Sequence, residues 1–589
     1  MEQLAVPLSI RLTSPYFVLG VRVALAVLTR TYFQPDEYFQ ALEPAHYAVF
    51  GYGHLTWEWL TPRPIRSIIY PAVYIPLYWF LKVTALDRFD VLMIFLPKLL
   101  TGVLSAGTDI GIAKLARVVL GNDYVATAVF LSLTSFFNAL SLSRSLSNSL
   151  ETSLCSLAFA YYPWDANPGI SPHIIYNRSN LRKVLVFSAL ACVVRPTNAV
   201  IWVFLYAKLL WALHKYWTLV FALVTDAAVT ALSAFAFIFV CDSLYYGKAT
   251  FTPYNFLITN LSSISSFYGT SPWHYYLSQG LPMLGTTALP FAFLGIYHTW
   301  KSKDTPRRSF ALENMLYTIM WSVGIYSLAG HKEWRFLHPL LPLLHIFAAK
   351  SLVDLHDLSS KPATPSSKKL VSTSTAPVAK PRQRHSKKGL HCWNDLPIRK
   401  SHVYFLLAAL PASLVGFLVY PSEPISVLSY IRSLPLDGEK IFTHTIGFLT
   451  PCHSTPGHAY IHREALSVPG RIWSLGCEPP LDGQHLSAYQ DQTDVFFSSP
   501  KEYLKEHFPS NVNPDFPASP FPASLPGQSG VQQWHHEWPK HIILYGDLLK
   551  EELGVKELLE EKGFNEVKRY GIWGPGTKNG GLRVWRWEG

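Results

Sequence analysis

The sequence has few charged residues for its length. Asp, Glu, Lys and Arg make up 15% of the 589 residues, whereas soluble proteins have about a quarter. Hydrophobic residues make up 49% and aromatic residues 14%, and the mean hydropathy is +0.16. This composition excludes a wholly soluble protein, an intrinsically disordered chain and a collagen-like fibre. It predicts a polytopic α-helical membrane protein.

Cysteine is also scarce. The six cysteines are scattered and show neither a C-x-x-C pair nor the Cys/His spacing of a zinc site, so we expect no bound metal. Only Cys452 and Cys477 share a segment outside the expected membrane part. Two outcomes are open for them: a disulfide, if the segment lies in an oxidising lumen, or two buried thiols. We take the disulfide forward as the prediction.

Most of the excess positive charge is confined to one segment. The chain has 50 Lys and Arg against 39 Asp and Glu, and residues 356–402 contain ten of the basic residues but only two acidic ones. This segment is rich in Ser, Thr and Pro and has almost no aromatic residues on which bases could stack. It predicts a disordered basic tether and no nucleic-acid partner.

Long apolar segments predict a multi-span topology. A helix that crosses about 30 Å of hydrocarbon needs about 20 mostly apolar residues. The first segment lacks a small-residue cleavage site, so we expect a retained anchor. Arg195-Pro196 interrupts one segment, which is either one kinked helix or two helices. A luminal position for both 32–67 and 241–279 favours one kinked helix. About eleven crossings are predicted, at 12–31, 68–86, 90–108, 122–143, 146–163, 184–213, 217–240, 280–298, 312–330, 336–355 and 403–421.

Lys and Arg in short loops predict which side of the membrane each loop faces. The loop 299–311 and the tether are basic, so we place both, with the N-terminus, in the cytosol. We expect N-glycans at the sequons of Asn177 and Asn260, which puts 164–183 in the lumen despite its three basic residues. The segments that then also face the lumen are 32–67, 241–279, 330–335 and everything after 421.

The last segment differs in composition from the rest. It contains a strand-like run at 541–545 and a helical pattern at 555–562, so we expect a mixed α/β luminal domain. The predicted parts are an N-terminal segment with the first helix (1–31), a first luminal loop (32–67), a multi-span core (68–355), the tether (356–402), a last transmembrane helix (403–421) and the luminal domain (422–589).

The first luminal loop contains Pro35-Asp36-Glu37. Proline suits the first turn of a helix, and acidic residues there are favoured by the helix dipole. Adjacent residues on a helix point about 100° apart, so Asp36 and Glu37 cannot both face one substrate atom. We expect one carboxylate to act and the other to orient it. The alternative is an ordinary acidic first turn.

A second polar segment, His331–Phe336, lies at the mouth of a predicted helical hairpin. Lys332 and Arg335 flank Glu333, and such a pair of cations suits a phosphate group, because Arg holds its oxygens with two parallel hydrogen bonds. The alternative is a set of interfacial side chains with one ion pair.

Two weaker signals accompany these motifs. Arg195-Pro196-Thr197 either places a cation beside a lipid phosphate or marks a simple kink. The aromatic run Trp273–Tyr276 fits an aromatic belt at the membrane surface, or stacking on a sugar face.

These motifs together resemble one family. The string YFQPDEYFQALEPAH at 32–46, continued by Trp57-Glu58-Trp59, resembles the first luminal loop of glycosyltransferase family 22. The run His331–Phe336 matches that family's H-K-E-x-R-F motif, and Arg195-Pro196-Thr197 matches its R-P-T. Members of the family are mannosyltransferases of the endoplasmic reticulum with the GT-C fold, and their donor substrate is dolichyl-phosphate-mannose.

The resemblance implies roles for individual residues. Asp36 is the expected catalytic base, with Glu37 as its support. We expect transfer with inversion, an active site on the luminal side and no cofactor. The side chains expected to hold the donor phosphate are His331, Lys332, Glu333, Arg335 and Arg195. The side chains expected to bind substrate are Trp57, Glu58, Trp273, His274 and Tyr275.

Within the family, two segments resemble the members that add the third mannose of the glycosylphosphatidylinositol (GPI) anchor precursor. They are the loop from Phe251 to Tyr276 and the string Pro451–Pro456. The expected acceptor is therefore the lipid-linked GPI precursor, and protein partners are not predicted. One alternative is a sister enzyme with the same chemistry that acts on the N-glycan precursor or adds the fourth GPI mannose. Another is a solute transporter, although no internal repeat is present.

Overall fold

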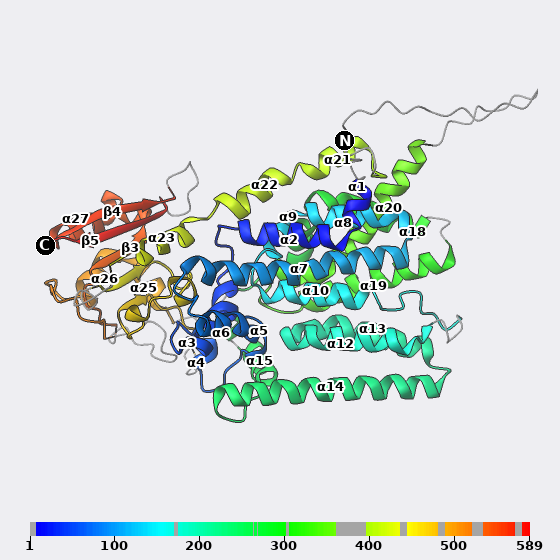
Figure 1. The fold of residues 1–589 in the computed structure, drawn as a ribbon, viewed down its shortest axis with the longest axis horizontal. Coiled ribbons are helices and arrows are strands. Elements are labelled where there is room, and N and C mark those ends of the chain that lie inside the picture. The colour runs from blue at the N-terminus through cyan, green and yellow to red at the C-terminus, as the bar shows by residue number, and fades with distance from the viewer. Residues whose placement is uncertain are drawn as a thin grey trace, which may run out of the picture.

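The computed structural model describes residues 8–169, 175–262, 264–267, 269–301, 305–360, 396–435, 444–480, 489–520, 534–571 and 580–589. The first part of the chain forms a bundle of helices, and a smaller domain with strands lies at one end of it (Figure 1). We call this end of the bundle the domain end. The opposite end, where α20 (Leu341–Ser360) stops and α21 (Lys400–Leu407) starts, we call the tether end. Residues 361–395 of the predicted tether lie outside the described residues.

The bundle confirms a mostly helical membrane protein. Six helical runs in the described part of the chain are long and apolar enough to cross a membrane: Asp90–Val119, Pro196–Leu213, Trp217–Tyr246, Tyr276–Lys301, Trp334–Ser359 and Lys400–Arg432. The other helices of the bundle are shorter or less apolar, so the total of eleven crossings stays a prediction. They include α1 (Leu8–Leu12), α2 (Pro15–Leu28), α8 (Val125–Thr134), α9 (Phe136–Ser141), α10 (Ser147–Phe159), α12 (Arg178–Val194) and α19 (Pro306–Ser327).

The crossing predicted at 68–86 is wrong. This segment forms two short helices, α5 (Ile69–Ala72) and α6 (Ile75–Val83). At 1.5 Å per residue, the nine residues of α6 extend only about 14 Å, less than half the hydrocarbon thickness. Pro71 and Pro76 divide the apolar run, and α6 packs against α3 (Glu43–Phe50) at the domain end (Figure 1).

The segment 184–213 is two helices, not one kinked helix. Arg195 is extended (φ −143°, ψ 106°) between α12 and α13 (Ala199–Leu213), as expected for a residue before proline. The two helices run antiparallel, side by side. The contact between the hydroxyls of Ser188 in α12 and Tyr206 in α13, which lie 2.7 Å apart, shows this. The crossing predicted at 68–86 is lost and the segment 184–213 supplies one crossing more. The total number of predicted crossings is therefore unchanged.

This hairpin also changes the predicted side of residues 164–183. Arg178 is 17 residues from Arg195 along α12, about 25 Å away, and Asp165 pairs with Arg307 of the basic loop. The described parts of the segment, 164–169 and 175–183, therefore lie at the tether end. The segment's three basic residues then lie on the same side as the basic tether. This agrees with the rule that loops rich in Lys and Arg face the cytosol.

The C-terminal domain confirms the expected mixture of helices and strands. Its sheet has the order β2-β1-β3-β5-β4, in which β1 is parallel to both β2 and β3, and β5 is antiparallel to β3 and β4. The run predicted at 541–545 is the buried strand β3. The strands are β1 (Ile446–Leu449), β2 (Ile472–Ser474), β3 (His541–Tyr545), β4 (Phe564–Tyr570) and β5 (Leu582–Trp587), and the helices include α23 (Glu423–Arg432), α24 (His458–Ile461), α25 (Gln492–Ser498), α26 (Pro500–His507) and α27 (Val555–Glu561).

The domain and the first loop share a hydrophobic core. Tyr38 and Phe39, in a single π-helical turn (Tyr38–Leu42), cluster with Phe448 and Tyr460 of the domain. The Tyr38 and Tyr460 rings meet edge to face, with centroids 5.2 Å apart. This packing fixes the loop that contains Asp36 against the C-terminal domain.

Candidate active site

A cavity of about 450 Å³ opens at the domain end of the bundle. It brings together five parts of the chain that are far apart in the sequence: the first loop, Arg195, the segment 256–265, the run that starts at His331, and the C-terminal domain. Among its lining residues are Gln34, Asp36, Gln40, Trp57, Glu58, Arg66, Arg195, Asn260, His331, Glu333, Arg335, Cys452, His453 and Cys477.

Asp36 meets the basic motif in this cavity. Its Oδ2 is 2.6 Å from Nη1 of Arg335, and the Asp36 side chain keeps 17% of its surface exposed. Pro35 starts the turn that presents it, as the sequence predicted, and the π-helical turn follows directly. Such turns occur frequently at functional sites. The two motifs, 299 positions apart, therefore share one site.

Glu37 points away from the cavity. Its side chain is 4% exposed and lies 3.3 Å from Nη1 of Arg144, which is itself buried. Oε1 accepts a hydrogen bond from the backbone N–H of Phe33 at 3.0 Å, and the Glu37 carbonyl accepts one from the Ser145 hydroxyl at 2.6 Å. Glu37 thus holds the turn in which Asp36 sits.

Glu333 organises the charges of the second motif. It pairs with Arg335 at 2.6 Å and with the His331 ring at 3.3 Å. Burial alone would raise the pKa of Glu333, but Arg335 and His331 outweigh it and hold that pKa well below its ordinary value. The hydrogen bond to Glu333 raises the pKa of His331. Both effects favour a protonated imidazole beside the cavity.

Lys332 does not line the cavity, contrary to the phosphate-holding role predicted for it. Its Nζ donates to the carbonyl of Ser271 at 2.8 Å, and the side chain is buried. The backbone N–H of Ser271 in turn donates to Gly330. His331, Glu333, Arg335 and Phe336 line the cavity, whereas Lys332 points out of it and anchors the neighbouring loop.

Two more arginines supply positive charge. Arg195 lies 3.3 Å from the buried carboxylate of Glu151 and 5.3 Å from the centroid of the Phe336 ring. Arg66 pairs with Glu58 at 2.5 Å. Sequence reasoning missed Arg66, although it lies only eight residues after Glu58 in the same predicted loop.

The predicted substrate-binding residues divide into two groups. Trp57 and Glu58 line the cavity, and Gln40 donates to Glu58 at 3.3 Å. Trp273, His274 and Tyr275 do not line it, which corrects the expectation for that aromatic run. Trp273 is 71% exposed, so the run fits an aromatic belt at the membrane surface.

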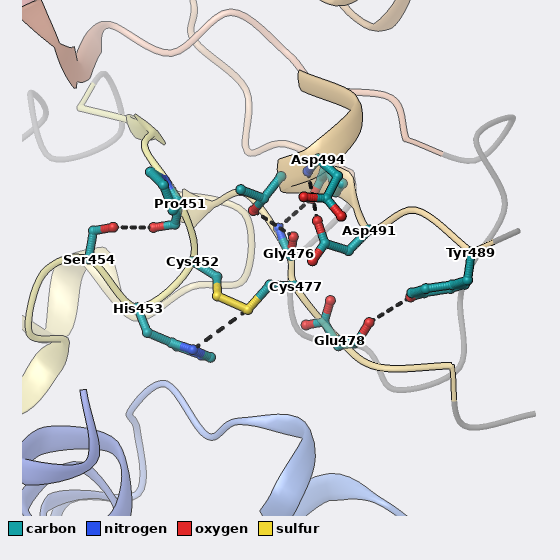
Figure 2. The surroundings of a disulfide bond; sticks show 12 residues. Pro451, Cys452, His453, Ser454, Gly476, Cys477, Glu478, Tyr489, Asp491 and Asp494 are labelled. Carbon is teal, nitrogen blue, oxygen red and sulfur yellow. Dashed lines mark hydrogen bonds between the residues drawn. A yellow bond between two sulfur atoms is a disulfide. The ribbon is translucent and has the colours of Figure 1, made fainter. Parts of the chain in front are cut away.

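The disulfide between Cys452 and Cys477 is present and forms part of the cavity wall (Figure 2). Their Cα atoms are 5.7 Å apart, which is ordinary for a disulfide. With His453 they make the one group in the described residues whose spacing would suit a metal. Because both sulfurs are in the disulfide, neither is available as a thiolate ligand.

The two sequons lie at opposite ends of the bundle. Asn260 lines the cavity at the domain end. Asn177 precedes α12 at the tether end and accepts a hydrogen bond from the N–H of Asn180 as its N-cap. N-glycans at both positions would therefore need opposite faces of the membrane, which contradicts the prediction for Asn177 if the cavity is luminal.

Comparison with known proteins identifies the family. The model of the Alg9-like mannosyltransferase family matches residues 14–462. The chain belongs to this family. Mannosyltransferase APTG1 of Arabidopsis thaliana is 32% identical, with 94% of this chain and 88% of that protein covered. GPI alpha-1,2-mannosyltransferase 3 of Mus musculus is 32% identical over 84% of this chain and 79% of that protein. GPI mannosyltransferase 3 of Yarrowia lipolytica is 30% identical, with 95% and 94% covered.

A solved structure shows the same fold. ArnT from Cupriavidus metallidurans, in a crystal structure with undecaprenyl phosphate, superposes with a TM-score of 0.52, covers 97% of this chain and 96% of its own, and is 12% identical. The family member therefore has the GT-C fold and is a mannosyltransferase, which decides against the solute transporter.

Proposed function

We propose that this Alg9-like family member transfers mannose from dolichyl-phosphate-mannose, in α-1,2 linkage and with inversion, to the second mannose of the lipid-linked GPI precursor. Relatives that carry the name GPI mannosyltransferase 3 match it along nearly its whole length. The single observation that carries the chemistry is the contact between Asp36 and Arg335 in a cavity.

Inversion needs a base on one side of the sugar and departure of the phosphate on the other. Asp36 is the base that takes the proton of the attacking hydroxyl. Arg335, Arg195, Arg66 and His331 face the same cavity and stabilise the phosphate that leaves. Each arginine is already paired with a carboxylate, so the phosphate competes with Asp36 for Arg335 and thereby releases the base.

The leaving group is a phosphate monoester, which is stable as an anion without strong acid catalysis. The proposed mechanism uses no cofactor, and its protein groups supply the positive charge around the phosphate. A disulfide in the cavity wall supports a site in the oxidising lumen of the endoplasmic reticulum.

A reconstituted assay tests the proposal. The purified chain, in liposomes, receives labelled dolichyl-phosphate-mannose and one of three acceptors: a one-mannose GPI precursor, a two-mannose GPI precursor or an N-glycan lipid precursor. We expect label only on the two-mannose GPI precursor, in a linkage cleaved by an α-1,2-mannosidase. Label on the N-glycan precursor alone would assign the sister activity, and no label with any acceptor would overturn the proposal.

A further inference from the structure

A second cavity, of about 290 Å³, lies next to the active-site cavity. The two share Phe39 and His453 as lining residues. One wall of the second cavity comes from the first loop and the other from the C-terminal domain. Its lining includes Tyr47, His54, Leu60, Phe448, Thr450, Ser454, Thr455, His458, Ser467, Trp473 and Ser474.

This cavity has the composition of a sugar site. Hydroxyl and imidazole groups provide hydrogen-bond partners, and the exposed ring of Tyr47 provides a flat apolar surface. Trp473 and Phe448 belong to the buried core behind the wall. Its volume is near the lower limit of small-molecule pockets. A long isoprenoid chain needs a groove in the membrane part, whereas this cavity is walled by the domain.

His458 in this cavity has an unsatisfied polar atom. Its side chain is 8% exposed, and in the described residues Nδ1 has no hydrogen-bond partner. Buried polar atoms without a partner are rare, and a ligand or water is the usual explanation. Burial, with a smaller effect of His54 and His462, lowers the pKa of His458 to about 4. The ring is therefore neutral and can accept or donate a hydrogen bond to a sugar hydroxyl.

Part of the wall of this cavity lies outside the segment that the family model matches. The family model ends at residue 462, whereas Ser467, Trp473 and Ser474 of the cavity wall lie beyond it. Enzymes with a common donor and common chemistry must differ where they bind the rest of the acceptor. A wall outside the family-wide segment, beside the reacting atoms, is suited to that difference.

We infer that the second cavity binds the glycan of the lipid-linked acceptor. It holds the sugar unit next to the terminal mannose, whose hydroxyl gives its proton to Asp36. The inference rests on the proposed function and adds the place where the acceptor is selected. His458 and Ser467 hydrogen-bond this sugar unit, and the exposed ring of Tyr47 contacts its apolar face.

Two variants of the full chain test the inference. His458→Phe removes the ring nitrogens and keeps the ring volume, and Ser467→Phe fills the cavity. We expect each to raise KM for the two-mannose acceptor about tenfold, the loss of one or two hydrogen bonds, while KM for the donor stays within twofold. The matched control is Ser498→Phe on the exposed surface of α25, which should change neither KM.

A second experiment uses the wild-type protein and does not depend on how the variants fold. A two-mannose acceptor with a photoactivatable group on the sugar next to the terminal mannose is cross-linked and the peptides are mapped. Labelling within 454–474, or at Tyr47 or His54 on the opposite wall, supports the inference. Transfer by the wild type with labelling only elsewhere, or with unchanged acceptor KM in both variants, overturns it while the proposed function stands. No transfer by the wild type overturns the proposed function itself.

Discussion

Glu43 joins the first loop to the C-terminal domain, and its removal is the sharpest test of that junction. The side chain is completely buried, and its carboxylate accepts three backbone hydrogen bonds. Oε1 accepts from His54 and from His458, both at 2.7 Å, and Oε2 accepts from Ala459 at 2.8 Å. Gly457 packs so closely that a Cβ there would lie 2.6 Å from Oε1.

Glu43→Ala leaves these three buried N–H groups without an acceptor. A buried group that loses its partner costs about 1–3 kcal/mol, so the variant should lose roughly 3–9 kcal/mol of unfolding free energy. That is comparable with the whole stability of a typical domain, about 5–15 kcal/mol. Because His54 and His458 line the second cavity, transfer activity should fall together with stability.

Glu43→Gln is the matched control. Burial raises the pKa of Glu43 to about 7, against the opposing effect of its three N–H donors. The neutral acid is thus well populated near neutral pH. In Glu43→Gln the amide oxygen can keep the bonds from His54 and His458, but the amide NH2 faces the N–H of Ala459, so this variant should lose only about 1–3 kcal/mol. A carboxyl whose folded pKa exceeds its unfolded value stabilises fully below about pH 4.5 and less as pH rises through 7. Wild type should therefore lose up to about 3 kcal/mol relative to Glu43→Gln over that range.

These differences are measured by thermal unfolding of the detergent-solubilised variants. The readout is the protease sensitivity of the C-terminal domain. Equal destabilisation by Ala and Gln would contradict this account, because Gln keeps both the side-chain volume and an oxygen that can accept from His54 and His458. A Glu43→Ala protein as stable as the wild type would refute the reasoning about the junction.

Two further changes separate the roles of neighbouring residues. Arg335→Lys should lower kcat/KM about 10- to 100-fold, because one ammonium cannot replace a guanidinium that contacts both Asp36 and Glu333. Lys332→Gln should leave the KM for the donor nearly unchanged. Equal donor KM values for the two variants would contradict the assignment of Arg335, and not Lys332, to the donor phosphate. Cys452→Ser should lower the unfolding free energy by about 3 kcal/mol and should reduce activity. Thermal unfolding and the transfer assay measure these two effects. Free thiols at both Cys452 and Cys477 in the active wild type, found by non-reducing peptide mapping, would show that the disulfide does not form.

The sequence predicted those features that depend on local patterns. Low charge and long apolar segments led to a helical membrane protein, and the apolar run at 541–545 led to a buried strand. Pro35 marked the first turn correctly, and the angular separation of adjacent helical residues anticipated that Asp36 and Glu37 face different ways.

The errors arose where tertiary packing decides. Apolarity cannot distinguish a short helix that packs against α3 from a membrane crossing, so 68–86 was misassigned. A proline in an apolar run allows either a kink or a reversal, and the contact between α12 and α13 selects the reversal. Lys332 and Arg66 depend on side-chain direction, which composition does not give.

The central claim is that Asp36 removes the proton of the acceptor hydroxyl in a cavity shared with Arg335. Single-turnover transfer by purified Asp36→Asn protein, with donor and two-mannose acceptor both saturating, tests it most directly. The account predicts a rate about 100- to 10,000-fold below that of the wild type, with donor affinity and thermal unfolding retained, because Arg335 keeps its contact with Glu333. A rate close to that of the wild type would contradict it.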